Sequence, residues 1–203
     1  RTFMNTELQK IQKDTEEWLE NFIEKPNTAF GGLEICPFAK HARTNKKITF
    51  RIGKHPYHDL VEHCKTGNEG YDVFIYAYDP TEWDTDAFHE MVYKANDENL
   101  ADHDMISLPD HPHSLERVNG VILNQGTYAY NMIAPLTALN SASAKLHSEG
   151  YYNHWQNAEE YMEAIFRGRV DPRTGIQKPS LNSRAMKTIK TIKNDIMSVF
   201  EHY

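Results

Sequence analysis

The sequence predicts an α+β fold built on a β-α-β-α-β core, with a helix before this core and a helical extension after it. Three stretches have the pattern of strands: residues 48–52 alternate apolar and polar side chains, 73–78 are apolar throughout, and 105–108 form a third short apolar run. Apolar residues at helical spacing in 56–66 and 85–95 predict the two helices between them. Short links in this order favour right-handed crossovers and a small sheet backed by helices.

Two arrangements of the sheet fit this order of elements. Residues 118–123 can supply a fourth strand and give a ferredoxin-like sheet, and a small three-layer sheet is the alternative. An amphipathic helix precedes the sheet and ends before Pro26. We expect the 203 residues to form a single domain, with a core over about 10–147 and a C-terminal helical extension over about 150–203.

Composition excludes several classes of function. The net charge of −7 argues against a nonspecific nucleic-acid binder, which needs a basic surface, and against binding to an anionic membrane. The two cysteines are too few for a disulfide framework. The first residues lack the apolar stretch of a signal peptide, and no apolar run approaches the roughly 18 residues of a membrane helix. The expected location is the cytoplasm.

Cys36 is the first candidate catalytic residue. It lies in a glycine-containing loop before the first strand and is followed by Pro37, with Lys40, His41 and Arg43 close in sequence. A nearby positive charge lowers the pKa of a thiol and makes it a nucleophile. The alternatives are a small buried side chain in the core, which is a common place for free cysteine, and a metal ligand.

The segment Asp110-His111-Pro112-His113 follows the third strand and is the second candidate. Residues i and i+2 of an extended chain point the same way, so His111 and His113 can converge on a zinc or iron ion, with His103 or Asp110 as a further ligand. The carboxyl end of a strand is also where open α/β sheets bind ligands. A solvated polar loop is the alternative.

The order of these segments resembles an uncharacterised bacterial family, a domain of unknown function. The resemblance is carried by Trp18-Leu19-Glu20 in the first helix, Cys36-Pro37-Phe38-Ala39 in the loop and the later His111-Pro112, over about residues 10–145. The C-P-F-A tetrapeptide is its most specific part. The resemblance implies the fold and a candidate site, and it implies no reaction.

Two functions follow as hypotheses. The first is a small cytosolic enzyme with a pocket at the strand ends, in which Cys36 and His111 react, Asp110 assists, and Arg43 or Arg51 holds a small anionic substrate. Its chemistry is either thiol-based transfer or hydrolysis or oxidation assisted by a divalent metal, zinc or iron. The second is a non-catalytic protein-binding or regulatory module. Its expected aromatic anchors are Tyr128, Tyr130, Tyr151, Tyr152 and Trp155.

Overall fold

A computed structural model describes residues 2–115 and 117–155 of the chain. Its helices of more than one turn are α1 (Thr2–Trp18), α2 (Ala39–Thr44), α3 (Pro56–Thr66), α4 (Thr85–Ala95) and α5 (Leu136–Ser148). Short π or 3-10 segments are η1 (Leu19–Ile23), η2 (Thr28–Phe30), η3 (Asn96–Leu100), η4 (Ala101–His103) and η5 (Tyr151–His154). The strands are β1 (Pro26–Asn27), β2 (Leu33–Glu34), β3 (Ile48–Ile52), β4 (Val73–Tyr78), β5 (Met105–Asp110), β6 (Arg117–Val118), β7 (Val121–Ile122) and β8 (Ala129–Pro135).

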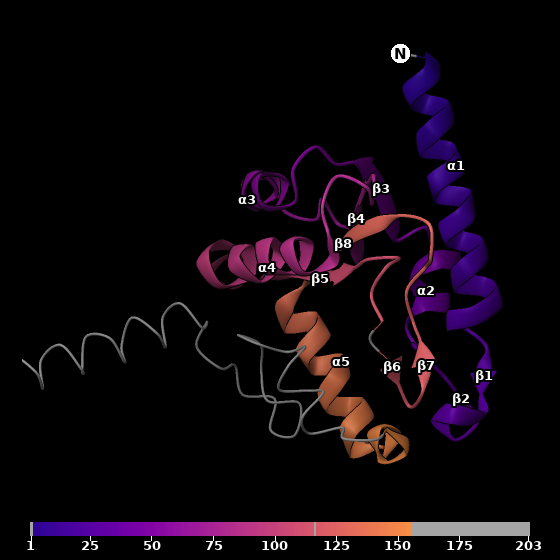
Figure 1. Ribbon diagram of the computed structural model, residues 1–203. Coiled ribbons are helices and arrows are strands. Elements are labelled where there is room, and N and C mark those ends of the chain that lie inside the picture. The colour runs from indigo at the N-terminus through magenta and orange to yellow at the C-terminus, as the bar shows by residue number, and fades with distance from the viewer. Residues whose placement is uncertain (1, 116, 156–203) are drawn as a thin grey trace, which may run out of the picture.

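The main sheet has four strands in the order β3-β4-β8-β5. Strands β3 and β4 are parallel, and β8 is antiparallel to both β4 and β5. Helices α3 and α4 lie on one face of this sheet and α1 lies on the other (Figure 1). The α+β class is therefore confirmed, and helices on both faces correspond to the three-layer arrangement.

The fourth strand comes from a different segment than the sequence analysis expected. Residues 118–123 do not join the sheet, because Asn119 and Gly120 both have positive φ angles, 52° and 79°, and turn the chain back as a hairpin between β6 and β7. Such a turn is typical of an Asn-Gly pair. The fourth strand is β8, which lies between β4 and β5 in the sheet. It has the polar residue Asn131 near its middle.

Each face of the sheet has its own apolar core. Under α3 and α4 the core contains the fully buried side chains Leu60, Phe74, Phe88 and Ile133 among others. Under α1 it is smaller and centres on Ile11 and Tyr130. A third cluster lies away from the sheet and joins the end of α1 and η1 to the loop before α2 and to the β6–β7 hairpin.

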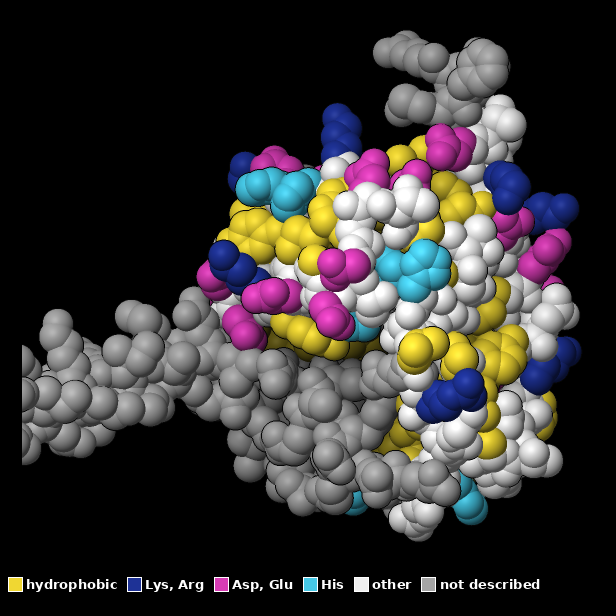
Figure 2. All heavy atoms as spheres, viewed as in Figure 1, with side chains coloured by type: hydrophobic (Ala, Val, Ile, Leu, Met, Phe, Trp, Pro, Cys, Tyr) yellow, Lys and Arg dark blue, Asp and Glu magenta, His cyan; other side chains and the backbone are white. Residues whose placement is uncertain are grey.

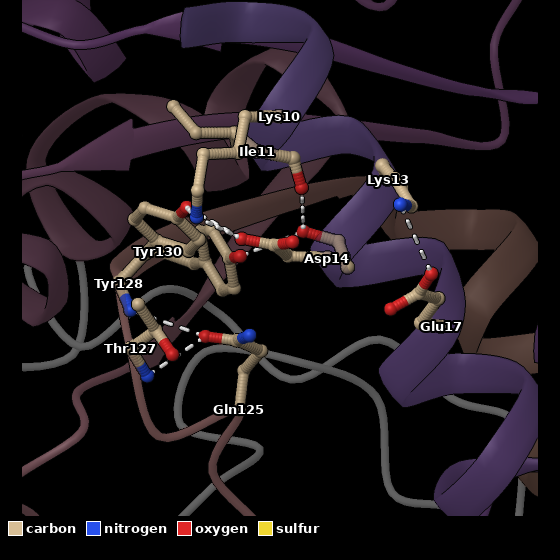
Figure 3. Close-up of polar contacts among 10 residues, drawn as sticks. Lys10, Ile11, Lys13, Asp14, Glu17, Gln125, Thr127, Tyr128 and Tyr130 are labelled. Atoms are coloured by element: carbon tan, nitrogen blue, oxygen red, sulfur yellow. Dashed lines mark hydrogen bonds and ion pairs between the residues drawn. The ribbon is translucent and has the colours of Figure 1, made fainter.

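Polar contacts supplement the apolar packing of α1 against the sheet (Figure 3). The Tyr128 hydroxyl donates to Asp14 Oδ2 at 2.7 Å, and Lys10 Nζ donates to the same oxygen at 2.6 Å. At the next residue of α1, the hydroxyls of Thr15 and Tyr130 lie 2.7 Å apart in a buried contact. These bonds fix α1 over the beginning of β8.

None of the helices in the described ranges combines the length and the apolar composition that crossing a bilayer requires. The predicted helical extension beyond residue 155 lies outside the described residues.

Gly53 provides a test of the packing at the end of β3. A Cβ atom on this residue would lie 2.1 Å from Tyr78 Cε1, and the Tyr78 ring is buried. We expect Gly53→Ala to lower the free energy of unfolding by about 1–3 kcal/mol, the usual cost of overpacking. Urea denaturation of the variant measures this, and an unchanged transition would show that the ring has room to move.

Candidate functional site

The carboxyl ends of three strands meet at one edge of the sheet. Strand β5 points the same way as β3 and β4, because β4 and β5 are both antiparallel to β8. The loops that follow these three strands contain His55, Trp83, His111 and His113. This edge is where ligands bind in open α/β sheets, so it is the candidate site.

The loop after β3 is closed by one carboxylate. Asp59 Oδ2 accepts hydrogen bonds from the backbone nitrogens of Lys54 and His55, at 2.7 and 2.9 Å. His55 then begins α3, because its Nδ1 accepts from the backbone nitrogen of His58 at 3.4 Å. His58 is exposed and His55 is half-buried, so both rings border solvent at this end of the sheet.

The loop after β4 combines an aromatic side chain with acidic ones. Asp79 accepts from the backbone and hydroxyl of Thr81, at 2.9 and 2.7 Å, and both bonds lower the pKa of Asp79. Asp84 begins α4 by accepting from the backbone nitrogen of Ala87 at 2.8 Å. Between them, Trp83 is half-buried.

Asp110 is the buried acid of this edge. Only 9% of the residue is exposed, and its Oδ2 accepts from the backbone nitrogen of Gln125 at 2.9 Å. Burial raises the pKa of the Asp110 carboxyl to about 7, although the backbone N–H groups of Gln125 and His111 oppose this shift. Its charge also raises the pKa of Tyr130, whose own burial is the main cause of that increase. Asp110 therefore faces the α1 side of the sheet.

His111, the next residue, faces the α4 side. Its ring is 1% exposed and lies 5.6 Å from the Phe88 ring between centroids. Nε2 lies 3.2 Å from the carbonyl oxygen of Trp83, and Nδ1 lies 3.1 Å from the Thr85 hydroxyl and 3.2 Å from the backbone nitrogen of His113. Both ring nitrogens are thus occupied by protein partners. His111 attaches the start of α4 to the end of β5.

A continuous series of ring contacts runs along this edge. Neighbouring ring centroids lie 4.4–6.0 Å apart. The order is His58, His55, Trp83, Tyr78, Phe88, His111 and His113. The rings in the middle are buried, whereas those at both ends reach the surface.

The structure does not bring Cys36 and His111 together. Cys36 is half-buried and packs in the cluster formed by the end of α1, η1 and the β6–β7 hairpin, whereas His111 packs on Phe88 in the core under α4. Burial raises the pKa of the Cys36 thiol, and the backbone N–H groups of Phe38 and Ala39 oppose this shift. Within the described ranges, the contacts of Cys36 are those of a packed side chain.

The predicted metal ligands His111, His113 and His103 do not form a set. Residues 2–115 and 117–155 contain no group of three His, Cys, Asp or Glu side chains that could hold a metal ion. Both nitrogens of His111 have protein partners, and Nδ1 of His103 contacts the carbonyl oxygen of Asn99 at 2.9 Å. His113 is exposed, and its ring lies beside that of His111 without a shared third side chain.

The two candidate anchors for an anionic substrate have other partners. Arg43 makes two hydrogen bonds of 2.8 Å to the buried carboxylate of Glu24, which ties α2 to η1 and raises the pKa of Arg43. Arg51 is exposed, lies over the Phe74 ring at 4.9 Å and approaches Glu69 at 3.5 Å. Neither guanidinium lies among the residues of the strand-end loops.

The aromatic residues proposed as partner anchors contact one another or the core. Tyr130 is fully buried, and the Tyr151 hydroxyl donates to the carbonyl oxygens of Glu34 and Ile35. Trp155 packs edge-on against Phe30 at 5.3 Å and contacts Tyr152 at 5.4 Å. Tyr128 bonds to Asp14, as described above.

The sequence analysis did not place Trp83 and His55 together on one strand-end surface. The signal that could have found them is the position of both residues in loops that directly follow parallel strands.

Comparison with known proteins does not extend this description: no family model, no curated protein and no solved structure matches the chain. The resemblance to the uncharacterised family therefore stays a prediction.

The contacts of Cys36 predict an unreactive thiol. In a Cys64→Ser background, we expect alkylation of folded Cys36 at neutral pH to be at least about 10-fold slower than in the denatured chain, because burial disfavours the thiolate. Labelling rates followed by mass spectrometry measure this. A rate above that of a free thiol, with a midpoint below the ordinary thiol pKa, would restore the nucleophile hypothesis.

The raised pKa of Asp110 predicts that ionisation of its carboxyl group lowers the free energy of unfolding. The folded state holds the proton more tightly than the unfolded state, so stability falls as pH rises from 3.8 towards 7. Asp110→Asn does not titrate and keeps an oxygen for Gln125. Its stability relative to the natural chain should rise by ~2–3 kcal/mol between about pH 5 and about pH 8, at ~1.4 kcal/mol per pKa unit.

Urea denaturation at both pH values measures this difference. Asp102→Asn, at an exposed position, is the matched control and should show no such gain. An Asp110→Asn difference that does not change with pH would contradict a buried carboxyl of raised pKa.

Proposed function

We propose that this protein is a non-catalytic binding module that recognises a basic segment of a protein partner. The binding face comprises the loop after β4 and the exposed side of α4, with Trp83 at its centre. This is the second of the two functions considered from sequence, with a different surface and different anchors.

The observation that carries the proposal is a group of exposed carboxylates in the loop that contains the half-buried Trp83 and along α4, which follows it. Its acidic members are Asp79, Glu82, Asp84, Asp86 and Glu90. None of them forms an ion pair with a Lys, Arg or His side chain in the part of the chain that the structure describes. Figure 2 shows acidic side chains gathered over α4, with histidine beside them.

This arrangement suits a cationic partner better than an anionic molecule. A group of negatively charged carboxylates attracts a positively charged segment and accelerates its association. The exposed part of an indole ring offers a contact for a guanidinium or ammonium group. The net charge of −7 acts in the same direction.

The enzyme hypothesis has less support from the same contacts. Cys36 packs in the cluster at the end of α1, whereas His111 packs on Phe88 under α4, and the nitrogens of His111 are occupied. Asp110 is the one group whose raised pKa would suit acid–base chemistry, but its carboxylate is buried and holds the loop at Gln125.

We also propose that the protein acts inside the cell. It is supported by Cys36 and Cys64, which are both free thiols in separate parts of the fold. Reduced cysteines are usual in the cytoplasm.

A synthetic peptide in which arginine alternates with alanine tests the binding face. We expect Asp86→Asn with Glu90→Gln to weaken binding of this peptide by about 2- to 30-fold, since each exposed charge pair contributes ~0.2–1 kcal/mol. Calorimetric titration at low salt measures the affinity, and added salt should weaken binding further.

The matched control changes the same number of charges elsewhere. Glu7→Gln with Glu17→Gln neutralises two exposed carboxylates of α1 and should leave the affinity near that of the natural chain. Trp83→Phe should reduce the binding enthalpy. Equal weakening by the α4 and α1 pairs would show that only net charge matters and would refute a localised binding face.

A further inference from the structure

The hydrogen bonds of His111 define which form of its ring is present. A carbonyl oxygen can only accept, so Nε2 must carry a proton and donate it to Trp83. A backbone N–H can only donate, so Nδ1 must be unprotonated to accept from His113. The ring is therefore the neutral Nε2–H tautomer.

The protonated ring cannot keep this arrangement. A proton on Nδ1 would point at the backbone N–H of His113 and end that bond, and the Thr85 hydroxyl would have to turn from donating to accepting. It would also place a positive charge on a ring that is 1% exposed and packed on Phe88. The buried charge and the lost bond from His113 thus destabilise the packed position of the ring between the end of β5 and the start of α4.

The groups around the ring act on its pKa in both directions, and burial is the largest influence. Burial is the largest cause that lowers the pKa of His111 below its usual 6.5, and His113 in the following loop adds to the decrease. On α4, His89 is electrostatically coupled to His111, and burial followed by this coupling lowers its pKa too. Three groups favour the charged ring, namely, from the largest, the carbonyl oxygens of Trp83 and Pro80 and the carboxylate of Asp84 at the beginning of α4.

We propose that His111 is a pH-sensitive latch: its neutral ring holds residues 83–85 against the end of β5, and protonation in mildly acidic solution releases this segment and moves Trp83. The latch itself requires no ligand. Only its consequence, that acidification alters the face that binds a basic segment, rests on the proposed function.

The direction of the pH dependence follows from linkage. The unfolded chain binds a proton at His111 more readily than the folded chain, so the stabilising contribution is complete above the usual pKa of 6.5 and decreases as pH falls through this value. The latch therefore opens towards acid and not towards base.

Fluorine NMR of the 5-fluorotryptophan-labelled protein without any partner tests the latch. The chain has three tryptophans, and Trp83→Phe assigns its signal. Between about pH 8 and about pH 5, a range in which histidine titrates, we expect the Trp83 signal to shift with a midpoint below 6.5. Trp18 and Trp155, in the cluster beside α2, serve as internal references and should keep their signals.

Two variants identify the titrating group. In a His55→Gln background, which removes the other imidazole beside Trp83, His111→Gln should abolish the shift of the Trp83 signal. His113→Gln keeps the backbone N–H and removes a neighbouring charge that lowers the pKa of His111, so the midpoint should move to higher pH. This second variant keeps the test decisive if His111→Gln does not fold.

The proposal is overturned if the Trp83 signal does not titrate while the chain stays folded. It is also overturned if the midpoint is the same in His111→Gln, or moves to lower pH in His113→Gln. These results do not depend on peptide binding, so the latch and the binding face can fail separately.

Discussion

The end of β5 joins the two helical layers of this protein through two consecutive side chains that point to opposite faces of the sheet. Asp110 accepts from the backbone of Gln125 and holds the loop that leads into β8, over which α1 packs. His111 binds the segment that begins α4, through the Trp83 carbonyl and the Thr85 hydroxyl. Because β5 is an edge strand, it has only β8 as a strand partner in the described sheet. These side-chain bonds therefore fix the position of its end.

This constraint explains why residues that suggest chemistry in the sequence have structural contacts here. A buried carboxyl of raised pKa and a buried histidine resemble an acid–base pair, yet they lie on opposite faces and each is bonded to backbone groups. The side chains that remain accessible at the strand ends are Trp83, the nearby carboxylates and the exposed histidines. Accessible charge around an aromatic ring favours binding over catalysis, and this is the basis of the proposed function.

Local pattern was sufficient to predict most of the fold. Strands β3, β4 and β5 and helices α3 and α4 follow from apolar periodicity, which local side-chain chemistry determines. Strand β8 does not, because Asn131 interrupts its apolar pattern and is accommodated only by the distant Tyr78 hydroxyl and Pro56 carbonyl. The Asn119-Gly120 pair is a local signal for the hairpin that replaces the strand expected over 118–123. For the site, the strand-end location could be predicted, whereas the partners of His111 and Arg43 depend on contacts between distant segments.

The central claim is that His111 is a neutral structural histidine that joins β5 to α4. A long-range proton–nitrogen correlation spectrum of the nitrogen-15-labelled chain tests it most directly, since imidazole nitrogen shifts distinguish both tautomers and the charged ring. At slightly alkaline pH the account predicts a protonated Nε2 and an unprotonated Nδ1 for His111. A ring that carries its proton on Nδ1, or that is charged under these conditions, would contradict it.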